Sequence, residues 1–169
     1  SSSYGGGILF YVEGVINTQK TLILHGYAGG NIKNAQINKL LLRTNAVAEN
    51  VVTEYLDFSI YEYPNITFKN CIINQAVTQT SALERQKYFN CVFNGNITML
   101  GDNNIFENNK MAGNFTYTGD YGTITQNRIT GATTLQSGSE YNIITGNFFT
   151  GGITNNSGNT TNEINNNIG

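Results

Sequence analysis

The amino-acid sequence predicts an all-β solenoid, a single domain of stacked coils in which the pattern repeats at an offset of 18 to 20, with three strands per coil. The repeat is clearest where positions 91–101 are echoed at an offset of 18 by positions 109–119, with a glycine, an asparagine, a threonine and a second glycine in matching places. Apolar and polar side chains alternate within the pattern, as they do in strands that bury one face.

The repeat continues on both sides of this segment. Residues 70–74 match residues 90–94 at an offset of 20, and the sequence ITQN at 124–127 returns as ITGN at 144–147 and as INNN at 164–167. One glycine column, Gly101, Gly119, Gly138 and Gly158, keeps step with this repeat. The small variation in offset is typical of turns that differ in length from coil to coil.

Three apolar columns follow from this register, and they predict the three strands of each coil. The first contains Phe68, Tyr88, Phe106, Ile124, Ile144 and Ile164. The second contains Ile73, Phe93, Met111, Ile129, Phe149 and Ile168. The third contains Val77, Ile97, Phe115, Leu135 and Ile153.

Residues 1–64 fit the repeat less closely. The pairs Leu22/Leu24, Leu40/Leu42 and Phe58/Ile60 lie at two offsets of 18, which extends the third column backwards and predicts about eight or nine coils within residues 8–169. Residues 1–7 are interpreted as a linker or tag remnant, and the chain as a fragment of a longer protein. The final residues stop within the pattern, so a further domain or a partner chain is expected to cover the last coil.

Asparagine is the commonest residue and clusters between the apolar columns with glycine and threonine. Asparagine tolerates the left-handed backbone of tight turns, and stacked side-chain amides can bond from coil to coil. Two cysteines, Cys71 and Cys91, share one column a coil apart. Side-by-side Cβ vectors suit stacked buried thiols better than a disulfide, the alternative, and two cysteines without histidine or acidic neighbours make a poor metal site.

Composition excludes several classes of function. A net charge of -2 with 12% charged residues provides no basic stripe, so no nucleic-acid partner is predicted. No apolar run approaches the roughly 18 residues of a membrane span. The single histidine, His25, follows an apolar run and precedes a glycine, which indicates a turn and not a catalytic triad. Neither a metal nor another cofactor is predicted.

Acidic residues are the candidates for chemistry if the protein degrades a polysaccharide, because paired carboxylates serve as acid and base in such enzymes. The densest acidic run lies between residues 49 and 62, and it supplies Asp57 and Glu62; Glu84 follows. Alternation predicts that Asp57 points outward and stacks over Lys39 and Thr21. The alternative interpretation is a solvated column with one exposed ion pair.

Aromatic residues are the candidates for binding, since flat rings with polar groups beside them hold sugars. Tyr55, Tyr61 and Tyr63 alternate outward in the most irregular stretch of the chain. Residues 80–87 form a second interruption and include Arg85. Loops on a rigid solenoid are frequent binding sites, although strand-packing tyrosines and a plain connecting loop are the alternatives.

Residues 141–149, the Asn-Cys pairs at 70–71 and 90–91, and the asparagine-rich turns resemble the right-handed parallel β-helix proteins of the pectate-lyase-like group, and more narrowly those of phage tail spikes and appendages. The resemblance covers about residues 65–169. It implies a right-handed parallel β-helix. The lyases of that group use clustered Asp and Arg or Lys around calcium, and no matching cluster is found in this sequence.

The resemblance implies a structural or attachment module of a phage tail spike or appendage, a homotrimer in the virion tail that binds a host surface polysaccharide. Two alternatives stay open: a fragment of a polysaccharide-degrading hydrolase or lyase, and a bacterial surface adhesin located on the cell surface or secreted. The absence of a matched catalytic cluster favours a role without catalysis.

Overall fold

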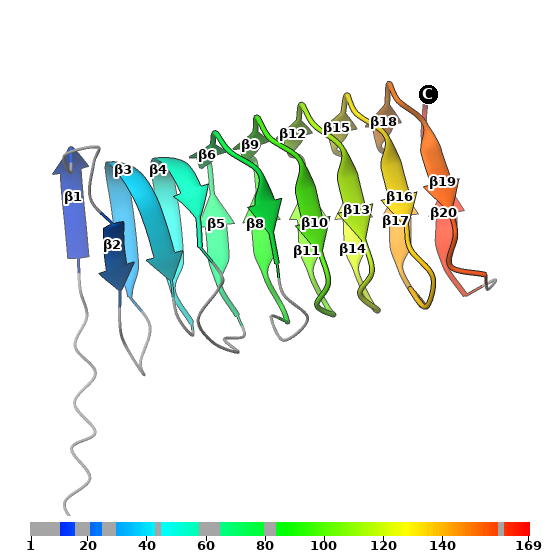
Figure 1. Ribbon diagram of the computed structural model, residues 1–169, viewed down its shortest axis with the longest axis horizontal. Helices are drawn as coiled ribbons and strands as arrows, with labels where there is room; N and C mark the ends of the chain where they lie inside the picture. The colour runs from blue at the N-terminus through cyan, green and yellow to red at the C-terminus, as the bar shows by residue number, and fades with distance from the viewer. Residues whose placement is uncertain are drawn as a thin grey trace, which may run out of the picture.

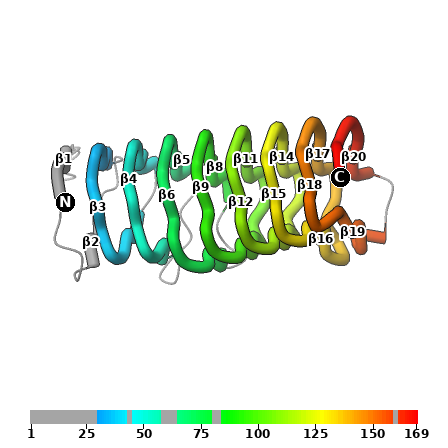
Figure 2. Tube along the Cα trace, turned by 90° about the horizontal axis from the view of Figure 1, so that it is seen from above, coloured from blue at the N-terminus to red at the C-terminus, as the bar shows by residue number. Residues whose placement is uncertain are grey.

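The described residues fold as a parallel β-helix of about seven turns, stacked along one axis (Figures 1 and 2). The computed structural model describes residues 11–15, 21–24, 30–42, 45–57, 65–79, 84–158 and 161–169, with only the backbone for residues 11–15 and 21–24. Every regular element in these residues is a β-strand. The predicted all-β solenoid is confirmed, with about seven turns in place of the eight or nine expected.

Each regular coil contributes one strand to each of three faces, as predicted. The first face contains β5 (Thr67–Lys69), β8 (Lys87–Phe89), β11 (Ile105–Glu107), β14 (Thr123–Thr125), β17 (Ile143–Thr145) and β20 (Glu163–Asn165). The second face contains β6 (Ile72–Ile73), β9 (Val92–Phe93), β12 (Lys110–Met111), β15 (Arg128–Ile129) and β18 (Phe148–Phe149). The third face contains β7 (Val77–Thr78), β10 (Ile97–Met99), β13 (Phe115–Tyr117), β16 (Thr133–Leu135) and β19 (Ile153–Asn155).

Longer strands form the N-terminal part of the solenoid. They are β1 (Tyr11–Val15), β2 (Thr21–Leu24), β3 (Asn31–Leu42) and β4 (Val47–Leu56). Strand β4 pairs with both β5 and β6, so it joins the first two faces into one 15-stranded sheet, while the third face is a separate five-stranded sheet.

The predicted register holds through most of the core. The first column is paired from coil to coil from Phe68 to Ile164, and the second from Ile73 to Phe149. At the end of the second column the prediction is wrong, because Ile168 pairs with Phe148 and is 67% exposed.

The third column is wrong at Leu135. Thr133, not Leu135, pairs with Phe115 and with Ile153, and both Thr133 and Leu135 are buried. The first and the third residue of this strand both face the core, so two inward positions were available. The apolar leucine was assigned to the position that threonine occupies.

Register also differs at the N-terminal coils. Leu22 and Leu24 pair with Leu40 and Leu42 as predicted, but Leu40 then pairs with Leu56, at an offset of 16. The offset of 18 is therefore not continued from β3 to β4, and positions 58–64 lie outside the described part of the chain.

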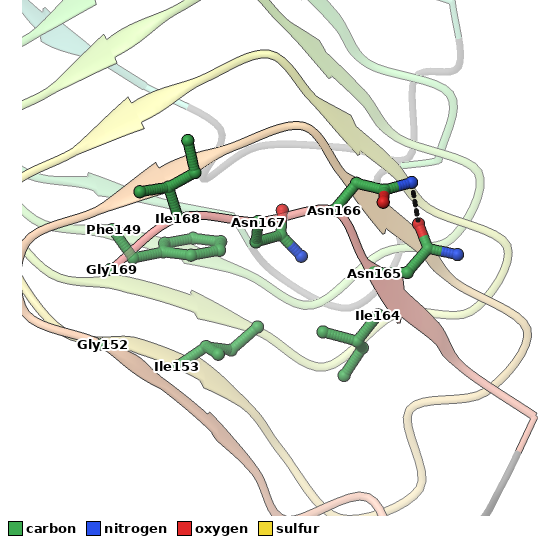
Figure 3. A pocket seen from close by; sticks show the side chains of 9 residues that line it. All are labelled: Phe149, Gly152, Ile153, Ile164, Asn165, Asn166, Asn167, Ile168 and Gly169. Atoms are coloured by element: carbon green, nitrogen blue, oxygen red, sulfur yellow. Dashed lines mark hydrogen bonds between the residues drawn. The ribbon is translucent and has the colours of Figure 1, made fainter.

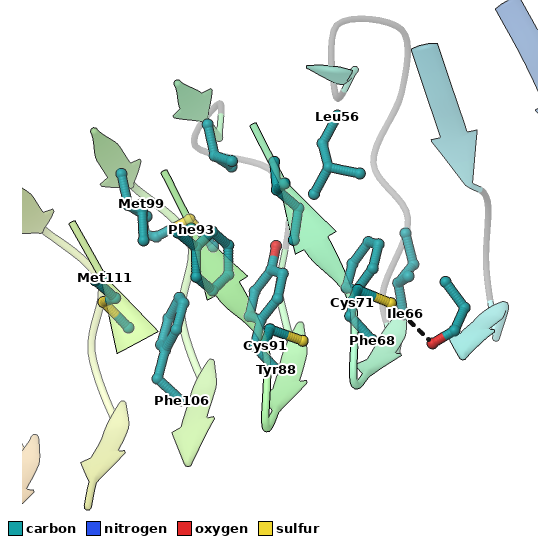
Figure 4. Close-up of a cluster of buried hydrophobic side chains, with 14 of the residues drawn as sticks. Leu56, Ile66, Phe68, Cys71, Tyr88, Cys91, Phe93, Met99, Phe106 and Met111 are labelled. Carbon is teal, nitrogen blue, oxygen red and sulfur yellow. Dashed lines mark hydrogen bonds between the residues drawn. The ribbon is translucent and has the colours of Figure 1, made fainter. Parts of the chain in front are cut away.

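Stacked aromatic rings fill the core between the first and third faces (Figure 4). The ring of Tyr88 lies between Phe68 and Phe106, at centroid distances of 4.9 and 4.8 Å with nearly parallel planes. Phe115 meets Phe106 edge to face at 5.0 Å. Because Phe68, Tyr88 and Phe106 belong to successive coils, this column ties the coils together along the axis.

A ladder of asparagines runs along the corner between the first and second faces: Asn109, Asn127 and Asn147 are buried, and Asn167 at the end is half-buried. The Asn127 side chain donates to the Phe106 carbonyl (2.9 Å), and its Oδ1 accepts the Asn109 backbone N–H (2.8 Å). The Asn127 backbone N–H in turn donates to Asn147 Oδ1 (2.8 Å). These amides satisfy the backbone groups that the corner leaves without strand partners.

The two cysteines continue this buried column toward the N-terminus. Both are free and buried, so stacked thiols are confirmed and a disulfide is absent. The Cys91 backbone N–H donates to Asn109 Oδ1 (2.8 Å). The adjacent Cys71 thiol and burial both raise the pKa of Cys91, so it remains a protonated, unreactive thiol at neutral pH.

Two glycine positions of the repeat are explained by close approach of neighbouring coils. A Cβ on Gly95 would lie 2.4 Å from the backbone nitrogen of Ala76, and a Cβ on Gly119 would lie 2.0 Å from the carbonyl oxygen of Gly101. No side chain fits at these distances, so only glycine allows the coils to stack there.

Candidate functional site

A hollow lies over the last described coil (Figure 3). It has a volume of about 220 Å³, and its walls include Phe149, Ile153 and Ile164. Both isoleucines are only half-buried. The hollow carries backbone and amide groups but no titratable side chain, so it offers no acid–base chemistry.

The predicted candidates Tyr55 and Asp57 lie together at the end of β4. Tyr55 pairs with Lys39 and is 47% exposed, and Lys39 Nζ lies 2.5 Å from Asp57 Oδ2. Thr21 pairs with Lys39 as expected, whereas Asp57 lies two positions beyond the one directly over Lys39. Asp57 is thus held in an ion pair beside an exposed ring.

Neighbouring carboxylates of the acidic run are also engaged. Glu49 pairs with Lys33 at 2.6 Å, a contact that lowers the pKa of Glu49, and Glu54 accepts a hydrogen bond from the Asn74 amide at 2.7 Å. The remaining candidates of this stretch, Tyr61, Glu62 and Tyr63, lie outside the described residues, as does His25.

Glu84 and Arg85 lie on the corner that leads from the third face back to the first, where two outward columns run from coil to coil. We name this corner the carboxylate–tyrosine edge. One column contains Glu84, Asp102, Asp120 and Glu140, and the next contains Arg85, Asn103, Tyr121 and Tyr141. The edge thus begins at two predicted candidates and continues along the following coils.

A regular backbone conformation holds the edge in place. Arg85, Asn103, Tyr121 and Tyr141 all have a positive φ, between 54° and 61°. Their backbone N–H groups point along the axis: that of Arg85 donates to the Asp102 carbonyl (2.9 Å) and that of Tyr121 to the Glu140 carbonyl (3.0 Å). A left-handed conformation is unusual for tyrosine, and the stacked coils impose it at the same place twice.

The conformation projects two tyrosine rings into solvent. Tyr121 and Tyr141 are 57% and 50% exposed, and their rings stack at a centroid distance of 5.1 Å with planes 8° apart. Ile143, two positions further along the chain, is 43% exposed. Together the three side chains form a small apolar patch on an otherwise polar corner.

Carboxylates line the side of this patch. Asp102 Oδ1 accepts the Asp120 backbone N–H (2.8 Å), and Asp120 Oδ1 accepts the Glu140 backbone N–H (2.7 Å). Each aspartate therefore keeps a second oxygen for other partners. No salt bridge of the described residues involves the edge carboxylates, and no group of acidic, cysteine or histidine side chains there could hold a metal ion.

Sequence reasoning did not identify Tyr121 and Tyr141. They lie in the regular half of the repeat, where nearly every residue was attributed to the fold. A signal was present: both tyrosines occupy the same place in the repeat, one coil apart, directly after an acidic residue. Recurrence of an aromatic residue at an outward turn position, outside the apolar columns, would have identified them.

Comparisons of the chain with protein-family models, curated proteins and solved structures found no match. Among the described residues, no helix could cross a membrane. The structure itself shows a parallel β-helix solenoid, and this fold does not specify a function.

Proposed function

We propose that the protein is a structural and attachment module of an extracellular appendage such as a phage tail spike, and that it binds a surface polysaccharide through the carboxylate–tyrosine edge. The observation that carries the proposal is the exposed, stacked pair of Tyr121 and Tyr141 beside Asp120 and Glu140. Aromatic rings provide apolar contact to sugar faces, and carboxylates accept hydrogen bonds from sugar hydroxyl groups.

The solenoid favours a polymer as the ligand. Equivalent backbone positions recur once per coil, at the strand spacing of about 4.8 Å, along a regular edge, and carry a carboxylate at each of four coils and a tyrosine at the last two of them. A polysaccharide chain laid along the axis meets the same pair of side-chain columns at each coil. Many weak contacts along the polymer then add up to a useful affinity, although no closed pocket encloses a single sugar. This kind of binding suits attachment better than hydrolysis.

Glycan-array binding tests this function. Wild-type protein should bind a subset of surface polysaccharides, and the double variant Tyr121→Ala/Tyr141→Ala should lose affinity by at least about tenfold, or about 1.4 kcal/mol. Phe148→Ala is the matched control, because Phe148 is an exposed ring on the second face, 41% exposed. Equal binding by the double variant, the control and the wild type would exclude the edge as the binding surface.

The proposal includes a homotrimer of parallel rods, which would cover exposed strand edges and surface apolar groups. Light scattering of the chain at micromolar concentration should then give three times the 18.5 kDa chain mass. A value equal to one chain mass at that concentration would contradict the trimer but leave glycan binding by a single edge intact.

A further inference from the structure

Charge on the edge restricts which glycan it accepts. Four carboxylates, those of Glu84, Asp102, Asp120 and Glu140, follow one another coil by coil, with Arg85 the single cation in the two columns. Like charges stacked directly in neighbouring strands repel each other. Because no described salt bridge neutralises Asp102, Asp120 or Glu140, the edge presents a line of uncompensated negative charge.

The arrangement of these carboxylates suits a linear polycation. One carboxylate per coil gives a spacing of about 4.8 Å, and the described residues contain no cluster that could surround a metal ion. An acidic polysaccharide is repelled by the same line of charge. A chain of amino sugars places positively charged ammonium groups at regular intervals. Its apolar ring faces stay free to contact the tyrosine rings.

Two glycines of the edge leave room for a buried tyrosine on the core side. The Tyr117 side chain is fully buried. It lies directly under the edge, since a Cβ on Gly122 would be 2.6 Å and one on Gly119 would be 3.1 Å from its hydroxyl oxygen. These two glycines flank Asp120 and Tyr121, so the Tyr117 ring packs beneath this part of the edge and supports it from the core.

We propose that the ligand of the carboxylate–tyrosine edge is a polysaccharide with free amino groups, bound with its ammonium groups at Asp120 and Glu140 and a sugar ring against Tyr141 or Tyr121. This inference rests on the proposed function and names its ligand class. It predicts that affinity depends on the protonated amine, on the carboxylates and on ionic strength.

The probes are glucosamine hexamer, its fully N-acetylated counterpart and a uronic acid hexamer, titrated at slightly acidic pH, where the amine is protonated. Wild-type protein should bind the glucosamine hexamer about threefold to tenfold more tightly than the N-acetylated one. Asp120→Asn/Glu140→Gln should abolish that preference. Salt on the order of 0.5 M should weaken it.

The carboxylate variant should fold normally. The structural role of Asp120 is to accept a backbone N–H of the next coil, and an asparagine oxygen does the same elsewhere: Asn114 Oδ1 accepts the Ala132 backbone N–H at 3.0 Å. Glu107→Gln is the matched control, since Glu107 is an exposed carboxylate at the far end of β11 from the edge. The control should keep the preference for glucosamine.

Each contrary result has a separate meaning. Binding that requires the tyrosines but favours the N-acetylated or the uronic acid hexamer would overturn the amino-sugar inference and leave the proposed function standing. A lysine-rich peptide bound as tightly as the glucosamine hexamer, at the same tyrosines, would overturn it in favour of a protein partner. Failure to bind any oligosaccharide would overturn both.

Discussion

Asn127→Leu is expected to destabilise the protein by about 3 to 5 kcal/mol. The amide is 1% exposed, and the leucine would leave the Phe106 carbonyl and the Asn109 N–H without partners in a buried corner. Each unsatisfied buried group costs about 1–3 kcal/mol, and the lost Asn127–Asn147 side-chain bond (3.0 Å) adds to this. Because the ladder joins successive coils, the loss should affect the cooperativity of unfolding as well as its midpoint.

Urea unfolding followed by far-UV circular dichroism measures this effect. Asn108→Gly is the matched control: Asn108 is an exposed neighbour with a φ of 55°, a conformation that glycine adopts without strain. The control should change the free energy of unfolding by less than about 0.5 kcal/mol. The free energy of unfolding of Asn127→Leu could instead lie within about 1 kcal/mol of the wild-type value, a difference no larger than one ordinary hydrogen bond. In that case the buried ladder does not hold the coils together.

Phe106→Ala is the second large effect, expected to cost about 3–5 kcal/mol. The Phe106 ring is fully buried and meets two rings of the preceding coil, at 4.8 Å from Tyr88 and 6.4 Å from Phe93 (Figure 4). It also meets a ring of its own coil, Phe115, at 5.0 Å. Alanine would leave a cavity that these rigid rings cannot fill without breaking the strand register.

Phe148→Ala serves as the control for aromatic removal. Phe148 is 41% exposed, and the Arg128 guanidinium lies 5.2 Å from its ring centroid, so a cost of about 0.5–1 kcal/mol is expected. Thermal unfolding of both variants compares them directly. Similar melting temperatures for Phe106→Ala and Phe148→Ala would mean that the aromatic column is not the core that stabilises the solenoid.

The sequence was sufficient for the fold because apolar columns and turn asparagines obey one period through most of the chain. Phe68, Tyr88 and Phe106 are assigned correctly since strand pairing forces equivalent residues to stack. Leu135 was misplaced because hydrophobicity alone cannot distinguish two inward positions of one strand, and Thr133 fills the other. At Leu40 the register shortens to an offset of 16, which a fixed period does not reveal.

The candidate site was only partly predictable. Arg85 was identified because residues 80–87 interrupt the repeat, and Glu84 because it follows the acidic run; both lie at the start of the edge. Tyr121 and Tyr141 were missed because their exposure depends on a left-handed turn conformation, which asparagine and glycine indicate in a sequence but tyrosine does not. Only the stacked coils show that these two rings meet in solvent.

The central claim is that the carboxylate–tyrosine edge, and no other surface, binds the glycan. Isothermal titration of the tightest array ligand into wild type, Tyr121→Ala/Tyr141→Ala and Tyr55→Ala tests it directly, because Tyr55 is an exposed tyrosine on a different part of the solenoid. We expect at least about a tenfold loss of affinity for the double variant and none for Tyr55→Ala. A loss confined to Tyr55→Ala, with the double variant unchanged, would contradict the claim and place binding at the end of β4.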